Sequence, residues 1–204
     1  MAGTANNFRL TGRVLGGGLL WGGLAVPSAG ARLTLAAVDA DGFYTPDATA
    51  NPLAYPIGAT KDGVVCSAKA TRSDYSVDEI RTLVDSRLET VEMSISASIH
   101  GIVDDVTAKL LTAGFGTYAT ASGYKEIAIG FGTDTFTGIA LIAPLREDPT
   151  KVFVFHIYKT INDSGIAFGV KHNELASSDV NFKGYAITTR TPSDQLGKFW
   201  WTIA

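Results

Sequence analysis

The chain has 204 residues, of which 46% are hydrophobic and 18% charged, and its formal net charge is −3 at pH 7. This composition excludes a disordered chain, and the slightly acidic balance excludes the basic surface with which proteins grip a nucleic-acid backbone. The single cysteine, Cys66, offers neither an internal disulfide nor a metal-binding spacing. We expect one compact domain over residues 1–204, made in a cytoplasm because the sequence has no secretory signal and no apolar run of bilayer length.

Glycines and prolines are frequent in the first 62 residues. Residues 1–30 predict a glycine-rich N-terminal arm with a short strand over 19–26, and residues 31–38 predict a second strand. Residues 39–62 predict a long contact loop that ends in an Asp62-Gly63 turn. A loop of roughly 20 residues inside a compact domain usually serves contacts or function.

Strict alternation of apolar and polar residues predicts two half-buried strands in the middle of the chain. From Thr90 to Ile99, the apolar side chains fall on one face, and threonine, glutamate and serine fall on the other. Residues 64–73 alternate in the same way, with Cys66 on the apolar side. The intervening residues 76–89 have helical spacing among charges, and we interpret them as a connection with a possible helical turn.

After Gly101 the spacing becomes helical, which predicts a short amphipathic helix over residues 102–111 with Asp104 and Asp105 near its positive end. Further strands are predicted at 125–130, 136–144, 151–160, 165–172, 178–190 and 198–204. The segment "INDSG" is expected to join strands 151–160 and 165–172 as a hairpin. The predicted fold class is mainly β with one flanking α-helix, in which two packed antiparallel sheets form a β-sandwich or barrel.

Reactive side chains do not cluster in a pattern typical of an enzyme. The three histidines, His100, His156 and His172, lack the spacing of a metal site, and the glycine-rich runs lack the spacing of a phosphate loop. The sequon at Asn162 is interpreted as a hairpin turn. We expect no catalytic, metal-binding or cofactor-binding residues, so binding or assembly is favoured over catalysis.

Three runs of sequence carry a family resemblance. They are "IGATKDGVVCSAKATRSDYSVDEI" with "ETVEMSISASI", then "DDVTAKLL" followed by "GTYATASGYKEIAIG", and finally "DPTKVFVFHIYKTINDSGIAFGVKHNELASSDVNFKGYAITTR". In this order they resemble the major tail tube protein of long-tailed, non-contractile bacteriophages. The likeness covers residues 57–204 well and the first 56 residues more loosely, and the order of features carries it, not a single motif.

The resemblance implies two packed sheets flanked by a helix, and six copies in a hexameric ring with a shared inner β-barrel. It implies that the rings stack around the tape measure protein and later form the channel for DNA ejection. Further implied partners are the tail terminator and distal tail proteins, and viral double-stranded DNA that passes non-specifically. The implied location is the virion tail, after assembly in the host cytoplasm, with no membrane insertion and no cofactor.

The alternating strands then predict which side chains line the channel. The expected lumen-facing residues are Ser67, Lys69, Thr71, Thr90, Glu92, Ser94, Ser96 and Ser98. Hydroxyl groups and a carboxylate let DNA slide, whereas a row of arginines would arrest it, so Lys69 is expected to pair with a carboxylate such as Glu92. The expected subunit-interface residues are Leu19, Leu20, Trp21, Phe43, Tyr44, Tyr55 and Trp200.

Several alternatives stay open on the sequence alone. Within the same class, the chain could be a terminator, a connector or a contractile-type tube protein. A small-molecule binder built on a β-barrel would have an apolar interior. A hydrolase whose catalytic groups are scattered along the sequence would have His156 as the first candidate catalytic residue. The aromatic residues Phe199, Trp200 and Trp201 fit a last strand buried between subunits, or one tucked into its own core.

Overall fold

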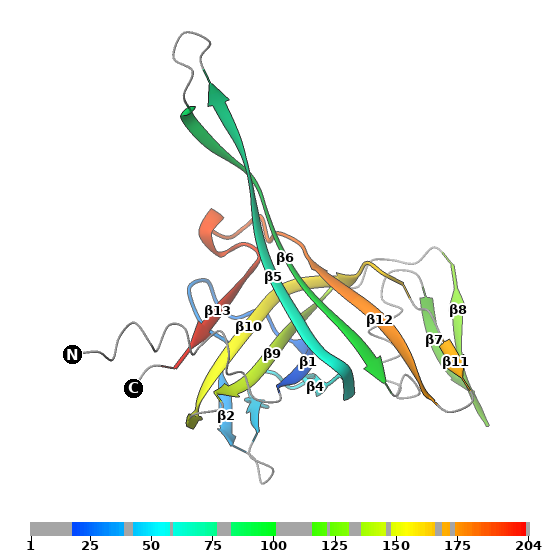
Figure 1. Ribbon diagram of the computed structural model, residues 1–204. Coiled ribbons are helices and arrows are strands. Elements are labelled where there is room, and N and C mark those ends of the chain that lie inside the picture. Colours follow the sequence, from blue (N-terminus) through cyan, green and yellow to red (C-terminus); the bar gives the residue numbers. More distant parts are fainter. Residues whose placement is uncertain are drawn as a thin grey trace.

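The computed structural model describes residues 18–38, 43–57, 59–76, 83–100, 116–121, 123–130, 136–145, 148–165, 169–171 and 174–202. Most of these residues lie in antiparallel β-strands, which confirms the mainly β prediction (Figure 1). The predicted helix at 102–111, with Asp104 and Asp105, lies outside the described residues. So do residues 1–17 of the predicted arm, and His172.

Every predicted strand overlaps a strand of the structure, but the short strands at 44–46, 55–56 and 116–121 were not predicted, and the first two lie within the expected contact loop 39–62. The described residues form thirteen strands. They are β1 (Leu19–Leu24), β2 (Leu35–Val38), β3 (Tyr44–Pro46), β4 (Tyr55–Pro56), β5 (Ala59–Ser76), β6 (Leu83–His100), β7 (Gly116–Ala121), β8 (Tyr124–Ile129), β9 (Thr137–Leu145), β10 (Asp148–Asn162), β11 (Gly169–Lys171), β12 (Glu174–Gly184) and β13 (Gly197–Trp201). A 3-10 turn, η2 (Pro192–Asp194), precedes the last strand.

Nine of the strands form one open sheet, whose main path runs β4-β1-β9-β10-β12-β6-β5. Strand β13 pairs with β10 and strand β11 pairs with β12, while β2-β3 and β7-β8 form separate two-stranded sheets. Strand β10 pairs with β12 over only three residues, from Thr160 to Asn162. The sheet folds over at this corner, so that β5, β6 and β12 lie across β10 and β9 (Figure 1).

The folded sheet encloses a first hydrophobic core, here called core 1. Its members come from β1, β6, β9, β10 and β12, and from the residue that follows β4. They are Leu20, Ile57, Met93, Ile95, Ala97, Ile99, Ile139, Leu141, Phe155, Ile157, Val180 and Phe182. The alternation predicted from Thr90 to Ile99 is confirmed from Met93 onward, because every second side chain of β6 lies in this core.

A second hydrophobic core, core 2, lies on the opposite side of β9 and β10. Its buried members are Leu24, Leu33, Ala140, Ile142, Val152 and Val154, and β2 and β3 pack over it through Leu35 and Tyr44. Strand β9 therefore has a core on each face, which explains its uninterrupted apolar run from Ile139 to Ala143.

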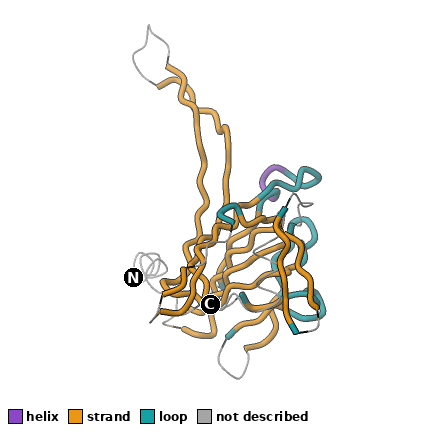
Figure 2. Tube along the Cα trace, turned by 90° about the vertical axis from the view of Figure 1, so that its right-hand side faces the viewer, coloured by secondary structure: helices purple, strands orange, loops and turns teal. Residues whose placement is uncertain are grey.

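Strands β5 and β6 form a hairpin of two 18-residue strands, each about 60 Å long at the usual rise. One half of the hairpin covers core 1, and the other half projects away from the body (Figures 1 and 2). The predicted helical turn within 76–89 is wrong from Leu83 onward, since that residue begins β6. Ala68 and Ala70 are exposed although their alternation predicted burial, because no other element of the described chain covers the projecting half.

Two local predictions are wrong for the same reason: residues typical of a turn do not determine which strands pair with each other. Asp62-Gly63 lies inside β5, where the register shifts between Thr60 and Val64, so Gly63 with its φ of +85° forms a β-bulge instead of a turn. The Asn162–Gly165 turn does form, since the Asn162 Nδ2 group donates to the Gly165 carbonyl at 2.7 Å. The strand that follows it, β11, pairs with β12 and not with β10 as predicted.

Candidate functional site

A continuous polar face runs across β12, β6 and β5. The pairs Ser67–Ser94, Lys69–Glu92 and Thr71–Thr90 stand directly opposite each other. Because alternate residues of a strand share a face, Ser96 and Ser98 join them. All eight residues expected to line a channel therefore lie on one face of the hairpin, and this face is the reverse side of core 1.

Strand β12 extends the polar face with three residues that sequence reasoning missed. Asp179, Asn181 and Lys183 stand opposite Ser98, Ser96 and Ser94. Their signal was present in the sequence, since residues 178–183 alternate strictly with the buried Val180 and Phe182. We call these eleven residues, eight on the hairpin and three on β12, the polar face. Val65, 66% exposed, is an apolar interruption on the same side.

The polar contacts on this face connect β6 to β12. The Ser96 hydroxyl donates to the Asn181 side-chain oxygen at 2.9 Å, and the Lys183 ammonium lies 3.7 Å from a Glu92 carboxylate oxygen. Lys69 stands opposite Glu92 in the register, but the ion pair that Glu92 makes is with Lys183. The polar face thus holds two lysines and two carboxylates, so its formal charge is balanced.

The opposite side of the hairpin carries an apolar strip beyond the end of core 1. Met93 is buried, whereas Val91 and Leu88, next along the same face, are 47% and 48% exposed. Ala68 and Ala70 stand opposite Met93 and Val91, and Arg72 stands opposite Leu88. A register shift between Thr71 and Arg72 keeps Leu88 on this side. We call Ala68, Ala70, Leu88 and Val91 the arm strip.

Most of the expected subunit-interface residues pack within their own chain. Leu20 belongs to core 1, while Trp21, Tyr44 and Trp200 pack against core 2 and Tyr55 against core 1. Leu19 and Phe43 are half-buried. On β13, the face of Trp200 packs against core 2, whereas Phe199 and Trp201 on the other face are 54% and 40% exposed. Packing into its own core is thus confirmed for Trp200, whereas burial of this strand between subunits stays a prediction.

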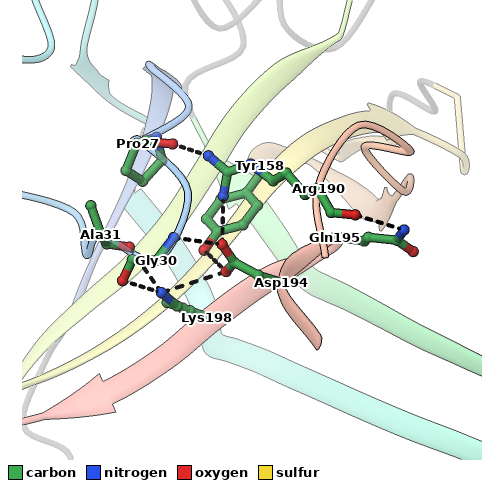
Figure 3. Close-up of polar contacts among 8 residues, drawn as sticks. All are labelled: Pro27, Gly30, Ala31, Tyr158, Arg190, Asp194, Gln195 and Lys198. Carbon is green, nitrogen blue, oxygen red and sulfur yellow. Dashed lines mark hydrogen bonds and ion pairs between the residues drawn. The ribbon is translucent and has the colours of Figure 1, made fainter. Parts of the chain in front are cut away.

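A buried ionic cluster ties the segment between β1 and β2 to the C-terminal region (Figure 3). The Asp194 carboxylate accepts from the Gly30 amide at 3.0 Å, from the Tyr158 hydroxyl at 2.8 Å and from Arg190 at 3.0 Å. Arg190 also donates to the Pro27 carbonyl, and Lys198 donates to the Gly30 carbonyl at 2.6 Å.

Hydrogen bonding stabilises the charged form of Asp194. The Gly30 amide is the largest cause that holds the pKa of this carboxyl below its usual range, followed by Tyr158 and the two cations. Burial raises the pKa of Tyr158, which therefore stays a hydrogen-bond donor. The cluster is fully engaged in holding residues 27–31 in place, which is a structural role.

His156 is buried beside this cluster, on the core 2 side of β10. Its ring meets Tyr158 edge to face at 5.1 Å, and in the part of the chain described neither ring nitrogen has a hydrogen-bond partner. Burial, and secondly the charge of Arg190, lower the pKa of His156 to about 4, so the ring is neutral at pH 7. A residue with 1% of its surface exposed does not reach a substrate from outside.

Other candidate sites offer little chemistry. Burial raises the pKa of the Cys66 thiol to about 12, which keeps it protonated and unreactive. A surface depression of about 750 Å³, lined by residues such as Leu24, Leu53, Phe136 and Ile187, lies where the end of β1, the start of β9 and the loop before β4 come together. The described residues contain no group of three or more side chains placed to hold a metal, and no helix among them could span a membrane.

Comparison with known proteins gives no independent identification. No protein-family model matches the chain, and no curated protein matches it significantly.

Proposed function

We propose that this chain is the structural subunit of a bacteriophage tail tube. In this proposal six copies form a ring, the rings stack around a tape measure protein, and the polar face lines the resulting channel. The proposal rests first on the resemblance of residues 57–204 to major tail tube proteins of long-tailed, non-contractile phages. The arrangement of the β5–β6 hairpin is the structural observation that supports it best.

That hairpin has the two-sided character needed by the wall of a water-filled tube. One side carries the polar face, and the other side carries core 1 and then the arm strip. A wall of this kind keeps its hydrophobic side against protein and its hydroxyl groups against water and DNA. The balanced charge of the polar face also favours free passage, because it offers no row of cations to bind phosphates.

The open ends of the sheet, as the described strands form it, support assembly over a solitary molecule. The main sheet is open, and the long strand β5 lies at one end of its path. Unpaired backbone groups along such an edge attract further strands, and proteins that expose them usually cover them in an assembly. A two-stranded hairpin that leaves the body of its protein is itself only marginally stable in water. Neighbouring subunits would provide the missing contacts.

Sedimentation velocity over a wide range of protein concentrations tests this proposal. The expected result is conversion of a 21.5 kDa monomer into a hexameric species and then into larger stacked particles. A species that stays monomeric at the highest soluble concentration would contradict the proposal. Lumen orientation is tested separately with Ser96→Cys in a Cys66→Ala background. In assembled tubes, a small maleimide should label this cysteine, and a maleimide carried on a large particle should not.

A further inference from the structure

The arm strip and the exposed face of β13 are two apolar surfaces on the same side of the folded sheet. Val91 and Leu88 continue the face of Met93, which lies in core 1. Phe199 and Trp201 stand opposite Phe155 and Phe153 of β10, and Phe155 also lies in core 1. Each surface is therefore an extension of core 1, one along the hairpin and the other onto the neighbouring strand.

The aromatic side chains on β13 form an ordered stack. Phe155 and Phe199 are nearly parallel with ring centroids 6.3 Å apart, and Phe199 and Trp201 are nearly parallel at 6.5 Å. Phe155 is buried, while the two residues of β13 are about half exposed. The body half of the hairpin lies across β10, but no described element covers this side of β13 (Figure 1).

From these two surfaces we infer a specific contact between copies of the chain. We propose that the arm strip of one copy docks on the Phe199–Trp201 face of β13 in the next copy. The inference rests on the proposed tube function, because it names the contact through which the ring would form. The projecting half of the hairpin then lies over the neighbour's β13 as the body half lies over its own β10.

The chemistry of the two surfaces matches. The strip supplies small and aliphatic side chains that can lie flat on aromatic rings, and burying them removes apolar surface from water. Arg72 stands opposite Leu88 on the same face of the hairpin. A guanidinium group there is suited to the face of an indole, which attracts cations. The cations near the β13 surface already have partners, since Lys198 binds Gly30 and Arg32 lies over Trp200.

The proposed contact is head to tail, because it joins two different surfaces of the chain. Each copy gives one arm strip and receives another on its β13, so the two surfaces in contact are different, and repetition closes a ring or builds a filament. The arm strip spans four residues of β6, so it is roughly 13 Å long and 10 Å wide, or about 130 Å² on one partner. This is less than a stable isolated pair requires, which is about 800 Å² per partner. The contact is therefore expected to hold as one of several in a closed ring, where every copy is held from both sides.

Cross-linking tests the contact directly in the assembled protein. Two single-cysteine proteins are made in a Cys66→Ala background, one with Leu88→Cys and the other with Phe199→Cys. They are mixed, assembled and treated with a bis-maleimide that spans about 10 Å. The expected product is a covalent dimer in the mixture and in neither protein alone. A protein carrying both cysteines should give a ladder of higher oligomers.

Other outcomes separate this inference from the proposed function. Hexamers that form without a cross-link in the mixture would overturn the contact and leave the tube proposal standing. A cross-link within the Leu88→Cys protein alone would also overturn it, because that product requires two arms to meet. Monomers at every concentration would overturn both proposals.

A matched pair of substitutions gives a second measurement. Val91→Glu places a charge on the arm strip, whereas Thr90→Glu places the same charge on the polar face one residue away. Both positions are exposed, so the two variants should fold with unchanged melting temperature. Val91→Glu should raise the concentration needed for assembly at least tenfold, and Thr90→Glu should leave it within twofold. Equal behaviour of the two variants would contradict the inference.

Discussion

The buried histidine of β10 makes the stability of the fold depend on pH in a window that its pKa defines. The pKa of His156 is about 4 in the folded protein and 6.5 in an exposed peptide. Between these values the unfolded chain binds a proton at this residue and the folded chain does not. Stability therefore falls as the pH is lowered from 6.5 to 4, at about 1.4 kcal/mol per pH unit, and reaches a loss of about 3 kcal/mol.

The assay is urea unfolding of the dilute monomer at several pH values between 4 and 7.5, compared with His156→Leu. Leucine removes the titrating ring and keeps an apolar side chain of similar size. The free energy of unfolding of the wild type, minus that of the variant, should decline steadily from pH 6.5 to pH 4. Curves that run parallel over this window would refute the reasoning, because they would mean that His156 is protonated equally in both states. Asp194 contributes its own loss only below pH 3.8, where a carboxyl with a lowered pKa gives up its stabilising charge.

Three further variants test the core, the ionic cluster and the polar face. Ile95→Asp places a carboxylate in core 1 and should abolish cooperative thermal unfolding, at a cost above about 4 kcal/mol in the free energy of unfolding. The control Ser94→Asp, on the polar face, should melt like the wild type. A normal melt for Ile95→Asp would contradict the assignment of this residue to the core side of β6. Asp194→Asn removes the charge shared by the buried guanidinium of Arg190 and the partly exposed ammonium of Lys198. It should lower the free energy of unfolding by about 2–4 kcal/mol in urea titrations, so an unchanged value would exclude a stabilising cluster. Replacing Ser94, Ser96 and Ser98 together by arginine should leave assembly intact but arrest DNA in the channel, and undiminished infectivity of phage carrying this change would count against a DNA-lining face.

The sequence predicted best where burial and periodicity agree. Residues Met93 to Ile99 alternate because one side of β6 faces core 1 and the other faces water, and a period of two follows directly from that geometry. The same rule, applied to residues 178–183, would have placed Asp179 and Lys183 on the polar face as well. The residues of the polar face could thus be grouped from sequence, although the partners of each side chain could not.

Sequence patterns failed where the decisive partner is distant along the chain. The residues from Leu83 to Glu89 show no strand alternation. Residues 86–91 are exposed, so within the described chain this part of the hairpin has no buried side that would require alternation. Asp62-Gly63 supplies a residue with positive φ, which a turn and a bulge both require, so the dipeptide alone could not decide between them. Lys69 faces Glu92 across one pair of strands, but the ion pair that Glu92 makes joins it to Lys183 on the strand at its other side, β12.

The central claim is that copies of this chain close into a tube with the polar face inside. Electron cryo-microscopy of the concentrated protein tests it most directly, because one image set reports both the symmetry and the orientation of β6. The account predicts hollow, sixfold particles in which Ser94, Ser96 and Ser98 border the channel and the arm strip lies against the next subunit. Dispersed single molecules, or tubes with these serines on the outer wall, would contradict it.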